Sequence, residues 1–264
     1  MGQVRLVPIL WSMATIHVGT SGYAYPHWRR ILYPERLPTR LWLARYAQVF
    51  STLELNTTFY RLPTAETVDH WRAVTPPRFL FAVKGSRFLT HMKRLTETGT
   101  GLDRFFSLVR RLGKKLGPVL WQLPPQMNQP DLPRLENFLS HLPRDVRHVF
   151  EFRHPVWYLA DVGELLDCYG AAFCEHDLVQ ASPPFVTGGF RYLRFHGATA
   201  KYAGRYRRRA LRRVAENLHT SRCEAFVYFN NDLYGHAVRD ALDLLKLLGE
   251  HPSMRAEELG ANSP

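Results

Sequence analysis

Cysteine and long apolar runs are both scarce in this sequence. The three cysteines, Cys168, Cys174 and Cys223, are scattered without metal-binding spacing. A sparse, odd count is typical of a reducing cytoplasm and argues against a disulfide framework. No apolar run approaches the roughly 20 residues needed to cross a bilayer. These absences predict a cytoplasmic chain with no membrane partner.

Acidic residues are also in the minority, with 23 Asp and Glu against 35 Lys and Arg and a formal net charge of +12. Such a charge favours anionic partners, namely nucleic acid, phosphorylated metabolites or anionic lipid. Hydrophobic residues make up 45% of the chain, and aromatic residues make up 13% of it. A composition of this kind predicts a globular protein with a substantial core rather than a disordered chain.

Three familiar cofactor and metal motifs are missing. Gly19-Thr20-Ser21-Gly22 follows the first predicted strand, but no GKS or GKT completes a P-loop. A dinucleotide-type glycine fingerprint is absent there as well, and no HExxH motif occurs. The cofactor therefore stays unknown, with a carboxylate-bound divalent metal as an open alternative.

Strands alternate with helices along almost the whole chain. The clearest unit is His148–Trp157, where an apolar run of period two ends in Glu151, Arg153 and His154 before Pro155 begins a helix. Strands are predicted at residues 15–18, 52–56, 79–83, 118–123, 149–152, 171–174, 190–195 and 225–229. Helices are predicted at 39–50, 64–74, 101–116, 132–142, 162–169, 206–219 and 235–248, with a loop at 178–189.

Eight strands and about seven helices predict an α/β fold, a single-domain (β/α)₈ TIM barrel over residues 15–250. A doubly wound sheet is the alternative, which the missing glycine fingerprint disfavours. Residues 1–14 are predicted to be an N-terminal extension, either disordered or the product of a start assigned upstream of Met13. Residues 251–264 are predicted to be a frayed tail.

Active sites of such barrels lie at the C-terminal ends of the strands, so polar residues there are the candidates. The catalytic candidates are Glu54, Glu151, Asp177, Lys84 and His196. The substrate-binding candidates are Tyr23, Asn56, Tyr60, Arg61, Arg87, Gln122, Arg153, Trp157, Arg194, Asn231 and Asp232. For any single residue the alternative is a structural ion pair, such as Glu54–Lys84.

Three chemistries fit these residue types. The carboxylates, with His196 or His91, are suitable ligands for a divalent metal. One of the glutamates could instead act as a general acid or base whose pKa is tuned by the neighbouring cations. Lys84 could form a Schiff base, although nearby Ser86 and Arg87 make anion binding the milder explanation.

Cations and aromatic residues follow many of the strands. The cations suit phosphate or carboxylate better than a neutral sugar, and they are Arg61, Lys84, Arg87, Arg153, Arg194 and Lys201. The aromatic residues could stack on a base or sugar or simply pack the loops, and they are Tyr23, Tyr25, Trp28, Phe59, Tyr60, Trp157 and Tyr202. Six arginines between Arg205 and Arg213 form either a solvated helix face or a nucleic-acid contact.

Several motifs, in order, resemble the YecE-like family, also called domain of unknown function 72. They are Val18–Tyr23 with Trp28, Glu54–Tyr60, Phe81–Lys84, Gln122–Pro125, Glu151–His154 with Trp157, Arg194–Gly197, and Tyr228–Asp232 with Gly235–Ala237. The resemblance extends from about Ile16 to Leu248 and implies a TIM-barrel fold without an established activity. The arginine-rich stretch departs from the family pattern, which is polar to acidic there.

Three functions remain open at this stage. The first is an enzyme, a hydrolase or isomerase, that acts on a phosphorylated or otherwise anionic substrate at the strand ends. The second is a nucleic-acid-binding or metal-dependent nuclease-like protein, by fold analogy. The third is a non-catalytic metabolite-binding protein. Neither the substrate nor the oligomeric state follows from the sequence.

Overall fold

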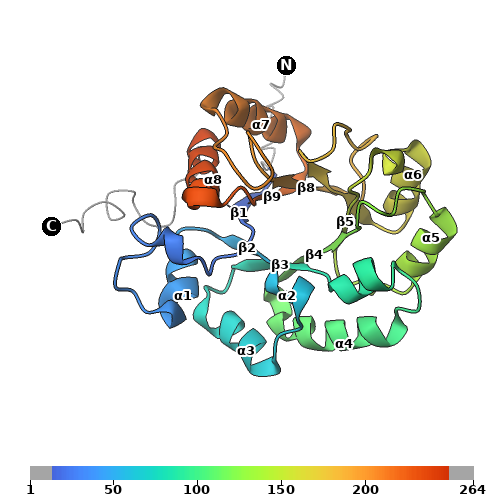
Figure 1. The fold of residues 1–264 in the computed structure, drawn as a ribbon, viewed down its shortest axis with the longest axis horizontal. Coiled ribbons are helices and arrows are strands. Elements are labelled where there is room, and N and C mark those ends of the chain that lie inside the picture. The colour runs from blue at the N-terminus through green and yellow to red at the C-terminus, as the bar shows by residue number, and fades with distance from the viewer. Residues whose placement is uncertain (1–13, 250–264) are drawn as a thin grey trace, which may run out of the picture.

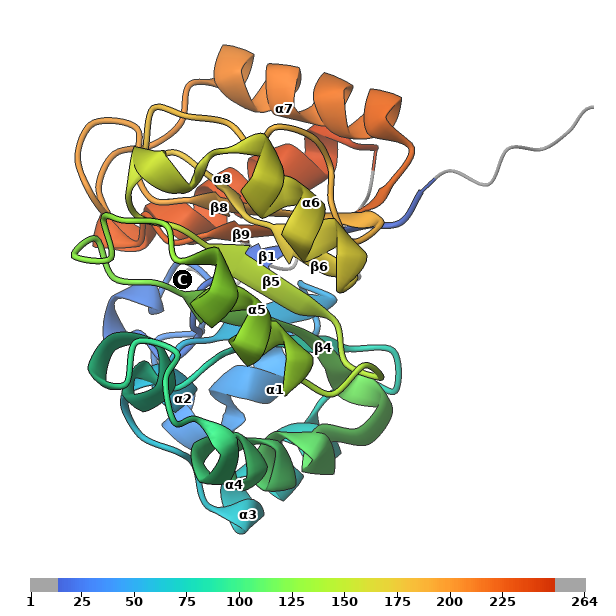
Figure 2. The same cartoon turned by 90° about the vertical axis from the view of Figure 1, so that its right-hand side faces the viewer.

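Parallel strands and the helices that follow them make up residues 14–249, the part of the chain that this computed structural model describes. The predicted N-terminal extension and C-terminal tail lie outside these residues, apart from Ala14. The strands lie at the centre of the molecule and the helices lie outside them (Figure 1). In the side view, α7 and α3 lie on opposite sides of the strands (Figure 2). The predicted α/β class is confirmed.

Hydrogen bonding arranges the strands in two parallel sheets. The five-stranded sheet has the order β2 (Thr52–Leu55), β3 (Leu80–Lys84), β4 (Leu116–Gln122), β5 (His148–Glu151) and β6 (Ala171–Phe173). The four-stranded sheet has the order β1 (Ile16–Thr20), β9 (Glu224–Phe229), β8 (Phe190–Phe195) and β7 (Glu175–His176). The first described strand therefore pairs with the last, with Ile16 opposite Ala225.

The two sheets adjoin at both of their edges. On one side an isolated parallel bridge joins Ser21, just after β1, to Glu54 of β2, and the N–H of Gly22 donates to the Glu54 carbonyl at 2.8 Å. On the other side a single residue, Cys174, separates β6 from β7. The predicted strand at 171–174 is thus extended and divided between the sheets, which is why nine strands are found where eight were predicted.

Eight α-helices lie between or after the strands in the described region. They are α1 (Trp42–Tyr46), α2 (Thr57–Tyr60), α3 (Ala65–Val74), α4 (Gly99–Val109), α5 (Leu132–Ser140), α6 (Ala160–Cys168), α7 (Arg208–Ser221) and α8 (His236–Leu247). Short 3₁₀ helices occupy Pro26–Trp28, Thr39–Leu41, Arg110–Lys115, Pro155–Trp157 and Leu233–Gly235, and a π-helix occupies Phe88–Met92. None of the described helices is long and apolar enough to span a bilayer.

Local chemistry explains where the helices agree with prediction and where they differ. Thr64 caps α3 as predicted, because its hydroxyl accepts the Thr67 N–H at 3.3 Å. The helix predicted at 101–116 ends at Val109 instead, and the chain continues as a 3₁₀ segment in which Gly113 takes a positive φ of 59°. Residues 178–189 contain no helix, as predicted.

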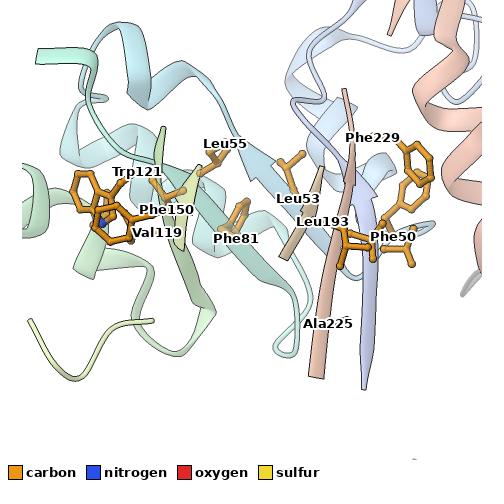
Figure 3. Close-up of a cluster of buried hydrophobic side chains, with 14 of the residues drawn as sticks. Phe50, Leu53, Leu55, Phe81, Val119, Trp121, Phe150, Leu193, Ala225 and Phe229 are labelled. Atoms are coloured by element: carbon orange, nitrogen blue, oxygen red, sulfur yellow. The ribbon is translucent and has the colours of Figure 1, made fainter. Parts of the chain in front are cut away.

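Side chains alternate between two core layers along each strand. Figure 3 shows part of the larger cluster, which includes Phe81 and Val119 and packs beneath the helices. A smaller cluster fills the space on the other face of the strands, and it consists of Ala82, Leu120, Val149, Ala172, Cys174, Phe190, Tyr192, Phe226 and Tyr228. Because side chains alternate with a period of two, the inner rows of β3, β4, β5 and β8 continue from Ala82, Leu120, Val149 and Tyr192 to Lys84, Gln122, Glu151 and Arg194.

Candidate functional site

A buried guanidinium connects the inner rows of the two sheets. Arg194, on β8, is 1% exposed. Its Nε and Nη2 donate to the two carboxylate oxygens of Glu54 at 3.0 and 2.7 Å, and its Nη1 donates to Glu151. Paired acidic neighbours offset the cost of burying this charge. The observed ion pair is therefore Glu54–Arg194, and the pairing of Glu54 with Lys84 considered from the sequence is not found.

The carboxylate of Glu54 is fully enclosed by hydrogen-bond donors. Besides Arg194, the Ser21 hydroxyl donates to Oε1 at 2.6 Å and the Tyr192 hydroxyl donates to Oε2 at 2.7 Å. Burial alone would raise the pKa of Glu54, but these donors, with Arg194 foremost, hold the pKa below its usual value. Glu54 is therefore a permanent anion that positions Arg194.

Glu151 is the second anion of the cluster. It is fully buried at the end of β5, and Arg153 and Arg194 both donate to it. Burial would raise its pKa, yet the two guanidinium groups hold the pKa well below the usual range. Arg153 in turn donates to the Gln122 side-chain oxygen at 3.0 Å, which ties the ends of β4 and β5 together.

His196 lies against both guanidinium groups, and its environment fixes its tautomer. Its Nε2 is 3.1 Å from Nη1 of Arg194 and 3.3 Å from Nη2 of Arg153. Since a guanidinium group can only donate, Nε2 must accept. Nδ1 then carries the proton and donates to Asp177 at 3.1 Å. Burial, with a contribution from Arg194, lowers the pKa of His196 to about 4, so the imidazole is neutral near pH 7.

Asp177, just after β7, is the third carboxylate. It accepts the backbone N–H of His196 at 2.9 Å and the hydroxyl of Tyr206. Tyr206 also accepts the N–H of Gly197 at 2.7 Å, so this group of donors ties the β8–α7 loop to the strand ends. Burial would raise the pKa of Asp177, but hydrogen bonds from His196 and Tyr206 keep the pKa below its usual value.

Lys84, at the end of β3, is buried beside these ion pairs without joining them. Lys84 is 8% exposed, and its Nζ lies 4.1 Å from the centre of the Phe59 ring. Within residues 14–249 no hydrogen bond or ion pair engages that nitrogen. Burial, reinforced by the charge of Arg194, lowers the pKa of Lys84 to about 7.

The donor set does not suit a metal ion. Among the described residues no three His, Cys, Asp or Glu side chains are grouped to hold one. Both oxygens of Glu54 already accept two donors each, and the Glu151 oxygens accept from guanidinium groups. A cation would have to displace arginine from the two buried glutamates. The metal alternative raised from the sequence has no support from this geometry.

The sequence-predicted residues separate into two groups in the structure. One group forms the connected cluster, and its members are Glu54, Gln122, Glu151, Arg153, Asp177, Arg194 and His196, with Lys84 next to them. Asn56 comes just after β2, and no described residue forms a hydrogen bond with its buried Oδ1. Tyr60, Arg61 and Arg87 are exposed residues that follow β2 and β3.

The other predicted residues have packing or loop-fixing contacts. Tyr23 packs against the outer core. Trp157 is 1% exposed and its indole N–H donates to the Met127 carbonyl at 2.6 Å. Asn231 donates to Gly204 and Asp240, and Asp232 accepts from Trp28 and His27. No contact joins these four residues to the cluster within the described part of the chain.

Sequence reasoning missed several residues that touch the cluster. Ser21 and Tyr192 bond to Glu54, and Tyr206 bonds to Asp177. Phe59, which the sequence offered as an aromatic residue that stacks on a ligand or packs a loop, covers Lys84. Tyr192 could have been predicted from the sequence, because it lies two positions before Arg194 and therefore points to the same face of its strand. The others come from loops and turns, whose side-chain directions a strand period does not determine.

A cavity of about 320 Å³ lies next to the cluster, where the 178–189 loop takes the place of a helix. It is lined by Asp177 and Pro183 on one side and by Arg213 and Asn217 of α7 on the other. A neighbouring cavity of about 350 Å³ shares Pro183 and Asn217 with it. This hollow borders Asp177 and the basic helix rather than Lys84.

Comparison with known proteins identifies the family. The model of the family described as "Protein of unknown function DUF72" matches residues 17–262. The chain belongs to the DUF72 family. This confirms the YecE-like resemblance seen in the sequence.

DUF72 relatives and structures resemble the chain to different extents. It is 30% identical to the UPF0759 protein YecE of Escherichia coli K12 over 143 residues, which is 54% of this chain and 50% of YecE, so the match spans about half the length of that relative. It is 24% identical to YunF of Bacillus subtilis, over 88% of this chain and 94% of YunF. A Thermotoga maritima DUF72 crystal structure is 28% identical, with a TM-score of 0.80 over 89% of this chain and all of that one.

Proposed function

We propose that this DUF72 protein binds a small anionic substrate, a phosphorylated or carboxylated metabolite, at the C-terminal ends of its strands. The observation that carries the proposal is the buried ammonium of Lys84, for which the described residues supply no acceptor. A largely buried cation whose contact is an aromatic ring rather than a hydrogen-bond acceptor or a counter-ion is costly. A bound anion would remove that cost, and exposed Arg61 and Arg87 near the same strand ends would draw it in.

The proposal includes closure of the two sheets into one (β/α)₈ barrel. The bridge between Ser21 and Glu54 joins β1 to β2, and β6 lies beside β8 where the chain crosses at Cys174. The inner core cluster draws residues from both sheets, including Leu120 and Tyr228. In such a barrel the C-terminal strand ends form the active-site face, which is where the polar cluster lies.

Within the cluster we assign different roles to the candidate catalytic residues. Glu54 and Glu151 position Arg194 and Arg153, because their oxygens are already engaged by donors. His196 and Asp177 form a neutral-imidazole and carboxylate pair that positions the guanidinium groups, because Nε2 of His196 accepts from Arg194 and Arg153 while Nδ1 donates to Asp177. Lys84 is the group left to contact the substrate. Whether a hydrolase, an isomerase or a binding protein results depends on that substrate.

Proton uptake tests the proposal directly. Calorimetry at pH 7.5 would measure binding of inorganic phosphate and of pyruvate in buffers of different ionisation enthalpy. An anion next to Lys84 raises the pKa of the amine from about 7, so binding should take up a proton. Lys84→Met should lose both binding and proton uptake, while exposed Lys114→Met should keep them. Binding that is unchanged in Lys84→Met would contradict the proposal.

Nucleic-acid binding is a second candidate, favoured by the surface of α7. Arg207, Arg208, Arg209, Arg212 and Arg213 are exposed, and none of them forms an ion pair with another described residue. Arg205, grouped with them from the sequence, instead pairs with Asp240 and Asp243. Three of the five, Arg207, Arg208 and Arg209, lie at the N-cap and in the first turn of α7, where the helix dipole disfavours cations.

Salt dependence tests this second candidate. If five phosphates are neutralised, the affinity for a single-stranded oligonucleotide should fall with a log–log salt slope of about −3.5. Replacing all five arginines by glutamine should abolish binding, whereas Arg36→Gln and Arg40→Gln, exposed elsewhere, should not. The slope is measured by fluorescence anisotropy at about 50 to 300 mM salt, because phosphate contacts weaken over roughly this range of salt concentration. A flat salt response would exclude phosphate contacts by this helix.

A further inference from the structure

The chain contains two buried lysines whose surroundings are opposite. Lys115 is 9% exposed, and its ammonium donates to the Arg72 carbonyl at 2.6 Å, to the Thr75 carbonyl at 2.6 Å and to the Thr75 hydroxyl at 3.0 Å. All three of its protons are used, as expected for a structural lysine. Lys84 is equally buried, yet its described surroundings offer an aromatic ring and no acceptor. The fold thus supplies three hydrogen-bond acceptors to an ammonium at Lys115, and at Lys84 the face of the Phe59 ring in their place.

The charged neighbours of Lys84 reinforce this difference. Arg194 and Arg153 repel a proton on its nitrogen, while the carboxylates of Glu54 and Glu151 that would attract it are engaged by those same guanidinium groups. Desolvation and adjacent cations are the two means by which proteins hold a lysine in its nucleophilic amine form. With a pKa of about 7, half of the Lys84 side chains are neutral at that pH.

We propose that Lys84 is a nucleophile that forms an imine with the aldehyde or ketone group of a small anionic substrate. This inference rests on the proposed function and refines it, because the substrate's carbonyl group would lie at the Nζ of Lys84 and its anionic group at exposed Arg61 and Arg87. The lone pair of Nζ attacks the carbonyl carbon, a C–N bond forms, and a proton moves from nitrogen to oxygen to give a carbinolamine. Uptake of one proton from solvent then expels that oxygen as water and leaves a C=N⁺ bond.

Two neighbouring groups suit the hydroxyl and the proton that this step creates. Leu55 of β2 is paired in register with Val83 of β3. Asn56 and Lys84 each come one position later on these adjacent strands, so they lie side by side. The Asn56 Oδ1 is buried and has no donor, and the carbinolamine hydroxyl would supply one. On the other side, the ring of His91 packs edge-on against Phe59, the ring that Lys84 also contacts.

His91 is suited to transfer protons in this step. Burial, with the charge of Lys84 next in importance, lowers the pKa of His91 to about 4, so its imidazole is neutral. Its Nδ1 lies 2.9 Å from the Thr90 hydroxyl, which leaves Nε2 for the substrate. A neutral imidazole can accept the proton that the attacking nitrogen releases.

Reductive trapping tests the inference with named probes. The protein would be incubated at pH 7.5 with glyoxylate, pyruvate or glycolaldehyde phosphate and then treated with borohydride, which reduces an imine to a stable secondary amine. Peptide mass spectrometry locates the product. We expect modification at Lys84 at least about ten times faster than at Lys115 or the exposed lysines, a preference worth about 1.4 kcal/mol in activation free energy. The rate should fall to half near pH 7 as the amine becomes protonated.

Control variants keep the result interpretable. Lys115→Met should leave trapping at Lys84 unchanged, and Lys84→Arg, which keeps the charge, should abolish it. Equal modification of all lysines by every probe would overturn the inference.

The trapping and binding experiments together distinguish this inference from the proposed function. If phosphate binds with proton uptake but no probe is trapped at Lys84, the anion site stands and the imine does not. If trapping occurs without phosphate binding, the imine stands and the anion site fails. If neither occurs, both are wrong.

Discussion

Arg194 joins strands that are far apart in the chain, since it contacts Glu54 across 140 positions and Glu151 across 43. Removing one partner of a buried ion pair leaves an uncompensated charge and typically costs about 3–5 kcal/mol. We therefore expect Glu54→Gln to lower the free energy of unfolding by about that amount, measured by urea denaturation at pH 7. The exposed ion pair Asp69–Arg111 is the control, because Asp69→Asn should give no measurable change. A stable Glu54→Gln would show that the pair contributes little.

Lys84 should make stability depend on pH in a predictable direction. Its pKa is lowered from 10.5 to about 7 in the folded state, so between these values the unfolded chain binds the additional proton. Stability therefore rises with pH in this window, by up to about 1.4 kcal/mol per unit. Relative to Lys84→Met, wild type should gain stability from pH 7 to 9, as measured by denaturant titration of both proteins. A constant difference would mean that Lys84 titrates normally.

At the residue scale, strand period predicted the positions of several side chains. Glu54, Lys84, Gln122, Glu151 and Arg194 lie at the ends of inner rows, and the alternation of apolar and polar residues placed them there. The sequence could not say which cation pairs with which anion, because pairing depends on how the strands are arranged across the two sheets. Trp157 illustrates the other limit, since an aromatic residue in a loop can equally stack on a ligand or fill the core.

At the scale of elements, β1 and β2 come together where Gly19 faces Thr52. A Cβ atom on Gly19 would lie 2.4 Å from the backbone oxygen of Thr52, which no side-chain rotation can relieve. We expect Gly19→Ala to destabilise the fold by at least about 1–3 kcal/mol through overpacking. Gly99→Ala is the matched control, because nothing lies within 4 Å of its added Cβ. Thermal denaturation of both variants measures the effect, and equal melting temperatures would contradict the close approach.

Helix α7 begins with cations and has no acidic residue in its first turn. Reversing the charge of Arg208 should improve the interaction with the helix dipole by about 0.3–1 kcal/mol at low ionic strength. Arg208→Glu should therefore raise the melting temperature in 20 mM salt and lose the gain in 1 M salt, whose Debye lengths are on the order of 20 and 3 Å. Arg208→Gln, which removes the positive charge without adding a negative one, should give a smaller gain. A drop in stability would indicate an unrecognised role for Arg208.

Helices and strands were predicted well in existence and poorly in their ends. The helix predicted to reach residue 116 stops at Val109, and the apolar period reveals neither the change to a 3₁₀ segment at Arg110 nor the positive φ of Gly113. The division of the sixth strand at Cys174 was also unforeseen. Its cause is the arrangement of neighbours, with β5 on one side and β8 on the other, and a single sequence carries no local signal for that.

For the whole molecule, the contacts between the sheets predict one cooperative unit. The inner cluster includes Ala82 and Leu120 from one sheet and Tyr192 and Tyr228 from the other, so neither sheet can bury this face alone. Unfolding in urea should give a single transition that coincides by far-UV circular dichroism and tryptophan fluorescence. Two separated transitions would instead indicate that the sheets unfold independently.

The overall class could be read from the alternation of strands and helices, because each unit carries its own hydrophobic pattern. The hydrophobic pattern of single units does not show that β1 pairs with β9. Only the count of eight predicted strands, which is that of a barrel, suggested that the first and last strands meet. How the strands close on one another is a property of the complete chain rather than of any segment.

The meeting of β1 and β9 also sets the order of events during protein synthesis. His17 and Glu224 contact each other across 207 positions, so β1 leaves the ribosome long before its partner exists. At about 5–20 residues per second, the delay is roughly 10–40 s. Throughout that interval the edge of β1 and its apolar residues Ile16 and Val18 lack the strand that covers them. We therefore expect premature termination before β9 to leave an unpaired, aggregation-prone edge at β1.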